Sequence, residues 1–194
     1  MGNYTLASGE SMVQSYPVDG AVVITNTTGA KIIASLNQLR RLSATSKWTG
    51  ITQSMGLPVD KISNIYVMPR YDYSDPGSLY DAVLLANVDT VSRDITVTIG
   101  GTPMGTYTLA PSESQYKTYP GVVGGPVVVS SVTGAKIIAS IYELKRAVPT
   151  AGWNGQSEMI GIPWEELSDS YVIPRYFGAF NPDTLDSRIF IAVP

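Results

Sequence analysis

Three aspartates lie close together in the segment YDYSDPGSLYD and form the densest group of carboxylates in the chain. Carboxylate oxygens with serine hydroxyls beside them suit calcium, so Asp72, Asp75 and Asp81 are candidates for a calcium site in a loop. Their spacing is not that of an EF-hand, and the related segment NPDTLD offers only Asp183 and Asp186. The alternative is a solvated turn between two strands, in which aspartate supplies the turn geometry.

Acid/base catalysis of glycoside hydrolysis needs two carboxyl groups placed on either side of a substrate. Glu165 and Glu166 supply the residue types, but adjacent residues on a helical turn point in different directions. Their counterparts earlier in the chain, Asp60 and Lys61, do not keep a pair of carboxylates. The chain contains no histidine and no cysteine, which excludes a Ser-His-Asp triad, a cysteine nucleophile and a His/Cys zinc site. We therefore expect a protein that is not an enzyme and holds no cofactor.

Two tryptophans, Trp48 and Trp153, occupy matching positions in the segments KWTG and GWNG. An exposed tryptophan with tyrosines nearby can stack on a sugar ring, and the alternative is an aromatic plug over the open end of a β-sheet core.

Asn3 and Asn26 fit the N-x-[ST] pattern of glycosylation, which matters only in a secreted protein.

The low content of charged residues and the acidic pI limit the kinds of binding partner that we expect. Charged residues make up 15% of the chain, the formal net charge is −3 and the pI is about 4.9. Such a surface offers little to a nucleic-acid backbone, so we expect no nucleic-acid partner. No run of about 18 apolar residues is present, so we expect no membrane span. The first residues, MGNYTLASGE, lack the basic and apolar regions of a signal peptide.

A sequence repeat covers nearly the whole chain, and it places several of the candidate residues above at matching positions. TGAKIIAS occurs at residues 28–35 and again at 133–140. The match continues on both sides, with ten of seventeen residues identical between 1–17 and 104–120. The period is about 103 to 106 residues, which indicates two related structural units.

We place the units at residues 1–103 and 104–194. The second unit lacks a counterpart of residues 89–103, which contain the alternating Ile95, Val97 and Ile99 of a half-buried strand. The expectation is a piece of a longer repeat array, or a subunit whose missing strand comes from a neighbour. In either case the missing signal peptide says little about location.

The same side chains recur in both units. Arg70 and Arg175 recur in PRY, and Lys31 and Lys136 recur in TGAK. A residue used once in each unit has a structural role inside that unit as its simplest explanation.

Short segments rich in Val, Ile, Tyr and Thr, separated by Gly, Pro, Asn and Asp, predict roughly seven strands in each unit. The segment AKIIASIYELKR also fits one helical face, but its position directly after a Thr-Gly turn favours a strand. Pro58 and Pro163 begin what we predict to be single helical turns. The predicted fold is all-β, with two tandem immunoglobulin-like antiparallel β-sandwich units that strand exchange can complete.

The segments YVMPRYDY, VLLANV, TYTLAPSES, TYPGVVGGPVVVSS and GAKIIAS resemble, in this order, a family of tandem repeats in large secreted or surface-anchored prokaryotic proteins. The resemblance implies β-sandwich modules that extend, stack or display. The first unit departs from the family pattern at SYPVDGAVVIT. In the second, Tyr176 is followed by Phe177 where the pattern has aspartate.

The expected function is therefore that of a non-enzymatic structural protein of the extracellular space or cell surface, part of a filament, sheath or surface layer. Its partners would be copies of itself or neighbouring repeat units, joined by pairing of edge strands. The residues expected to matter most are Gly29, Ile32 and Ile33, their counterparts Gly134, Ile137 and Ile138, and the strand at residues 95–99. The alternative is an adhesin or carbohydrate-binding module that contacts cell-surface glycans through Trp48 and Trp153.

Overall fold

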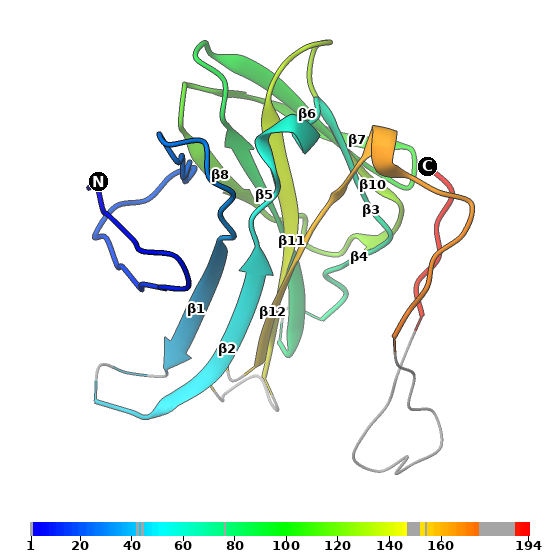
Figure 1. The fold of residues 1–194 in the computed structure, drawn as a ribbon. Helices are drawn as coiled ribbons and strands as arrows, with labels where there is room; N and C mark the ends of the chain where they lie inside the picture. The colour runs from blue at the N-terminus through cyan, green and yellow to red at the C-terminus, as the bar shows by residue number, and fades with distance from the viewer. Residues whose placement is uncertain are drawn as a thin grey trace.

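The computed structural model describes residues 2–41, 43, 45–75, 77–146, 152–153, 155–174 and 189–194. Within these ranges the chain forms β-strands joined by turns, with two single turns of 3-10 helix (Figure 1). The prediction of an all-β protein with antiparallel sheets is confirmed. None of the described helical segments has the length and apolar character that crossing a bilayer requires.

Two larger sheets lie face to face and share one core. The five-stranded sheet contains, in spatial order, β13 (Ile162–Pro163), β3 (Ile65–Met68), β10 (Val127–Ser130), β6 (Arg93–Ile99) and β7 (Thr102–Leu109). The four-stranded sheet contains β12 (Gly155–Ile160), β11 (Ile137–Lys145), β5 (Leu79–Asn87) and β8 (Ser114–Lys117). Neighbouring strands in both sheets are antiparallel.

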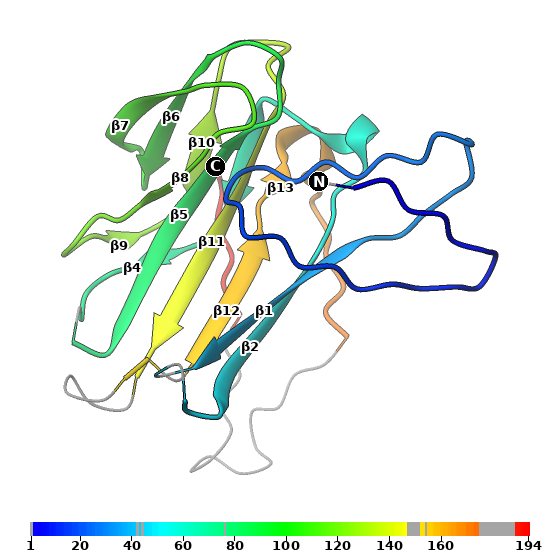
Figure 2. The ribbon, with the colours of Figure 1, turned by 90° about the vertical axis from the view of Figure 1, so that its left-hand side faces the viewer.

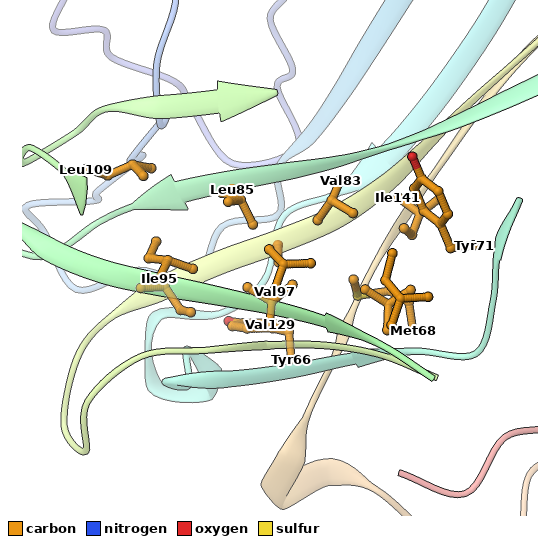
Figure 3. Close-up of a cluster of buried hydrophobic side chains, with 14 of the residues drawn as sticks. Tyr66, Met68, Tyr71, Val83, Leu85, Ile95, Val97, Leu109, Val129 and Ile141 are labelled. Carbon is orange, nitrogen blue, oxygen red and sulfur yellow. The ribbon is translucent and has the colours of Figure 1, made fainter. Parts of the chain in front are cut away.

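Alternation along the strands explains the core. In β6, Ile95, Val97 and Ile99 are buried, while the residues between them are partly exposed. Figure 3 shows Val83 and Leu85 of β5 directed toward Ile95 and Val97 of the opposite sheet. Every second side chain thus enters the space between the sheets, as the period-two pattern of these segments predicts. We call this assembly of two sheets the two-sheet core.

The two-sheet core does not follow the boundary drawn at residue 103. That boundary falls inside β7, and the β6–β7 hairpin joins the strand that precedes it to the strand that follows it. Residues of the first repeat supply β3, β5 and β6, whereas residues of the second supply β7, β8 and β10 to β13. A repeat fixes the period of a fold but not its phase, and both units contribute strands to the one core, with β7 spanning the boundary.

Two smaller sheets complete the described structure. Strands β4 (Tyr71–Asp72) and β9 (Val123–Gly124) form a short pair. Strands β1 (Ser35–Arg41) and β2 (Trp48–Met55) form a hairpin that lies beside β12 (Figure 2). The Gln156 side-chain amide donates to the Gln38 carbonyl at 2.8 Å and links the hairpin to β12.

Several local predictions are confirmed. The segment AKIIASIYELKR forms β11 rather than a helix, and Pro58 and Pro163 precede the helical turns η1 (Val59–Lys61) and η2 (Trp164–Glu166). Two segments that fit the strand composition described above, GAVVITN at 20–26 and residues 189–193 of RIFIAV, are not strands in the structure. Both are apolar segments without a hydrogen-bonding partner strand in the described chain, and a strand needs a partner to form.

Candidate functional site

The aspartates that sequence reasoning grouped have separate partners. Asp72 accepts a hydrogen bond from the Arg70 guanidinium at 2.8 Å and from both the amide and hydroxyl of Ser74. These contacts lower the pKa of Asp72, although its partial burial opposes them. Asp75 accepts from the Gly77 amide at 2.9 Å and from the Ser78 hydroxyl, so it shapes the turn before β5.

The carboxylates of the calcium hypothesis do not converge. In the described residues no group of three or more His, Cys, Asp or Glu side chains gathers in a way that could hold a metal ion. Asp183 and Asp186, which belong to the same hypothesis, lie outside the described residues. The turn role that we considered as the alternative agrees with the hydrogen bonds of Asp72 and Asp75.

Asp81 differs from the other two because it is buried within the two-sheet core. Its Oδ2 accepts a hydrogen bond from the Asp72 backbone amide at 2.7 Å, while its Oδ1 is buried without a partner. Burial is the main reason that its pKa is raised to about 6; the Asp72 amide and the Arg70 guanidinium oppose this rise, and the Glu143 carboxylate adds to it. A carboxyl group of this kind takes up a proton in mildly acidic solution.

A cavity of about 190 Å³ opens beside Asp81 at one end of the two-sheet core. Its lining combines charged and apolar side chains: Pro69, Arg70, Asp81, Ile141, Glu143, Ser157, Met159 and Phe190. The Arg70 guanidinium lies 4.5 Å from the centre of the Phe190 ring, so a residue of the C-terminal segment covers part of this cavity. The volume is small compared with ordinary ligand pockets of roughly 300–1,000 Å³.

One of the two adjacent glutamates, Glu166, is engaged in an ion pair. Both lie on η2, and Glu166 forms an ion pair with Lys61 at 2.6 Å between exposed side chains. This contact joins counterparts from the two repeat units, because η1 carries Lys61 and η2 carries Glu166. The position of the pair agrees with a structural role.

Trp153 belongs to a group of aromatic side chains near one end of β5. Its ring meets Tyr80 edge to face at 4.8 Å, and the Arg146 guanidinium lies 4.4 Å from its centre. Tyr80 in turn stacks on Tyr73 at 5.1 Å. We call Tyr73, Tyr80 and Trp153 the aromatic group. The side chain of Trp48 lies outside the described residues.

Sequence reasoning missed the two tyrosines of the aromatic group. Tyr80 follows the period-two alternation of β5 and belongs to the face that points away from the two-sheet core, because Asp81, Val83 and Leu85 point inward. That alternation was the available signal. Only the fold brings Trp153, 73 residues later, against it.

The remaining candidates have ordinary surroundings. Lys31 and Lys136 are exposed, and Arg175 lies outside the described residues. Asn3 is exposed, while the Asn26 side-chain oxygen accepts from the Thr28 amide at 2.7 Å in a turn.

The strand singled out for assembly is internal. Ile95, Val97 and Ile99 lie in β6, which pairs with β10 on one side and β7 on the other. This strand has no free edge to offer a neighbouring chain. Ile137 is buried in β11, whereas its counterpart Ile32 is exposed.

The repeat extends to three-dimensional detail, including parts of the N-terminal segment that have no partner sheet. In β1–β2, Ser35 faces Met55, and 105 residues later in β11–β12 Ser140 faces Ile160. Gly29 and Gly134 have φ angles of 77° and 80° in the two Thr-Gly turns, a conformation that glycine adopts without strain.

Side-chain contacts repeat in the same way. The Ala7 amide donates to Glu10 at 2.8 Å, and the Ala110 amide donates to Glu113 at 2.7 Å. The hydroxyls of Tyr4 and Tyr16 are 2.9 Å apart, and those of their counterparts, Tyr107 and Tyr119, are 3.2 Å apart. The N-terminal segment therefore repeats turn and side-chain contacts of the second unit, although residues 2–34 form no strand.

No protein-family model and no curated protein matches the chain. Among solved structures, the crystal structure of Thermotoga maritima 1070 is similar over 52% of this chain and 94% of that one. The sequence identity is 11% and the TM-score is 0.36.

Proposed function

We propose that this chain is a non-enzymatic structural protein of the cell exterior, built from tandem β-sandwich units that assemble by strand pairing. The observation that carries the proposal is that the two-sheet core is shared between consecutive repeat units. Strands β3, β5 and β6 come from one unit, and β7, β8 and β10 to β13 come from the next. Units that share a core in this way make a continuous array rather than a series of independently folded domains.

The surface composition supports the location. Charged residues are 15% of the chain, and the exposed segments are rich in Ser, Thr and Gly, which suits a durable polymer. The resemblance of the sequence to repeats of secreted and surface-anchored proteins supports the same conclusion.

The test is the assembly state of the chain, measured by mass photometry and negative-stain microscopy over a range of concentrations. We expect a ladder of oligomers or filaments that grows with concentration. A monomer at every concentration would contradict both assembly by this chain and the proposed role of the repeat units in that assembly.

A second candidate function is carbohydrate binding, which the aromatic group favours. Tyr73, Tyr80 and Trp153 come together near one end of β5, and aromatic rings can stack on sugars. A glycan array is the direct test. This candidate requires binding that Trp153→Ala abolishes and that Tyr4→Phe, which alters an exposed tyrosine hydrogen-bonded to Tyr16, leaves unchanged.

A further inference from the structure

The repeat units place the same apolar positions in opposite environments. Val129 in β10 is completely buried, whereas its counterpart Ile24 is 57% exposed. Tyr66 in β3 is completely buried, whereas its counterpart Tyr171 is 58% exposed. Because the two units are related in sequence, Ile24 and Tyr171 lack the packed neighbouring strands that bury Val129 and Tyr66.

These exposed positions form two apolar runs in the described chain. One lies in the N-terminal segment and the other in the C-terminal segment: Val22, Val23, Ile24, Ile32 and Ile33, then Tyr171, Val172, Ile173, Ile189, Phe190 and Ile191. Scattered apolar side chains on a surface need no explanation, but contiguous runs of this kind mark an interaction surface.

The two segments carry complementary halves of a two-sheet core. Residues 22–25 are the counterpart of β10 and 32–40 of β11, while 170–173 are the counterpart of β3 and 189–193 of the end of β5. In the core, β10 pairs with β3 and β11 pairs with β5. Each segment therefore contains the strand sequences that the other needs as partners.

A single copy does not bring the two segments together. In Figure 1 the N-terminal segment lies to the left of the two-sheet core, and residues 167–174 and 189–194 lie to its right. Figure 2, turned by 90°, shows the N-terminal segment in front of the core and the C-terminal segment behind it. The partner strands for each segment must therefore come from another copy.

We propose that the C-terminal strands of one copy pair with the N-terminal segment of a second copy in the register that the two-sheet core uses. Val172 would then lie opposite Val23, as Val67 lies opposite Val128 between β3 and β10. This inference rests on the proposed assembly function and names its partner and its register. Because the two surfaces differ, the contact is head to tail and produces a filament when the rotation between copies does not close.

The chain has no cysteine, so introduced cysteine pairs report the register directly. The test pair is Val23→Cys with Val172→Cys, in the full chain under mild oxidation. The reference pair is Val67→Cys with Val128→Cys, which has the same strand register inside the core. The control pair is Val23→Cys with Ile173→Cys, which is displaced by one residue and therefore directs its side chains to opposite faces of the sheet.

We expect disulfide-linked dimers and higher oligomers from the test pair, an intramolecular disulfide from the reference pair, and at least tenfold less cross-linking from the control pair. A test pair that cross-links only within one copy would overturn the second copy as the partner. A test pair that stays reduced while the reference pair oxidises would overturn the register. If wild-type filaments still form in that case, the proposed function stands and this inference alone fails.

Ile24→Lys gives an independent readout that does not depend on disulfide geometry. Ile24 is exposed in a single copy, so the thermal midpoint of the monomer should stay within about 2 °C of wild type. In the proposed contact this position corresponds to buried Val129, so the lysine should raise the concentration needed for assembly at least tenfold. Val91→Lys, an exposed apolar position in the loop between β5 and β6, is the matched control and should assemble normally. Normal assembly of Ile24→Lys would overturn the inference.

Discussion

Asp81 and Glu143 stand directly opposite each other on the neighbouring strands β5 and β11. Side chains that face each other across an antiparallel pair are close, so two carboxylates at this position repel each other when both are charged. Asp81 is the buried member, with one oxygen lacking a partner. The two-sheet core therefore contains a carboxylate whose charge Arg70 and the Asp72 amide offset only in part.

The first prediction concerns the pH dependence of stability. Burial raises the pKa of Asp81 from the ordinary aspartate value of 3.8 to about 6. The folded state therefore binds a proton that the unfolded state has already released, and this stabilisation is complete below about pH 4 and is lost as the pH rises through 6. Asp81→Asn should remove this pH-dependent loss of stability and raise the thermal midpoint at pH 7 by roughly 5 °C.

Thermal unfolding at pH 4, 5, 6 and 7 checks this prediction for the wild type and the variant. The difference between the two should grow from pH 4 to pH 7. Asp60→Asn, which changes an exposed carboxylate on η1, is the control. Parallel curves for the wild type and Asp81→Asn would show that Asp81 does not titrate in this window.

A second prediction uses glycines at equivalent positions in the two units. A methyl group at Gly161 would meet the Met68 sulfur and, at 3.1 Å, Tyr66 Cβ, both in the packed core. At Gly56 it would meet atoms of Ala34 alone, of which the carbonyl oxygen is the nearest at 3.3 Å. Gly161→Ala should lower the free energy of unfolding by about 1–3 kcal/mol, and Gly56→Ala by less than about 1 kcal/mol. Urea denaturation measures both, and equal losses would contradict the packing explanation.

The third prediction concerns Asn87, which is buried at the end of β5. Its side-chain NH₂ donates to the carbonyl oxygens of Val91, Leu109 and Ala110 at 2.8 to 3.1 Å. Asn87→Asp replaces this donor by an acceptor and should cost about 1–3 kcal/mol of unfolding free energy. At Asn26 only the side-chain oxygen accepts a hydrogen bond in the turn, so Asn26→Asp keeps that contact and should be nearly neutral. Calorimetry at pH 7 compares the two variants.

A fourth prediction separates the fold from the assembly. Val129→Ala removes two methyl groups from the core and should destabilise a single copy by about 1–3 kcal/mol. Ile24→Ala removes more atoms from an exposed counterpart and should leave the single copy within about 0.5 kcal/mol of wild type. Denaturation at a concentration where the chain is monomeric is the measurement. A large loss in Ile24→Ala would mean that residue 24 already packs within its own copy.

Much of the fold was predictable because local patterns decide it. Alternation in DITVTI indicates β6, and a proline directly before the first helical residue marks the start of both η1 and η2. In AKIIASIYELKR the helical and strand patterns competed, and the antiparallel pairing of β11 with both β5 and β12 decided for the strand.

The rest depends on which segments meet, and local sequence does not contain that information. GAVVITN has the same pattern as the segment that forms β10, yet it lacks the flanking strands that β10 receives from β3 and β6. Asp81 was grouped with Asp72 and Asp75 by its place in the chain, but alternation along β5 directs it inward while the other two shape a turn. The aromatic group likewise joins residues from distant segments.

The chain enters and leaves the two-sheet core at one corner. Strand β13 pairs antiparallel with β3, so Lys61 before β3 and Glu166 after β13 form an ion pair at the same end. Under the proposed assembly, a pull along an array would load this corner together with the contact between the β1–β2 hairpin and β12. The ion pair and the short β13–β3 ladder would then open one bond after another and lengthen the chain while the buried strands keep their shape. Such a corner would give a fibre an elastic response before its units rupture.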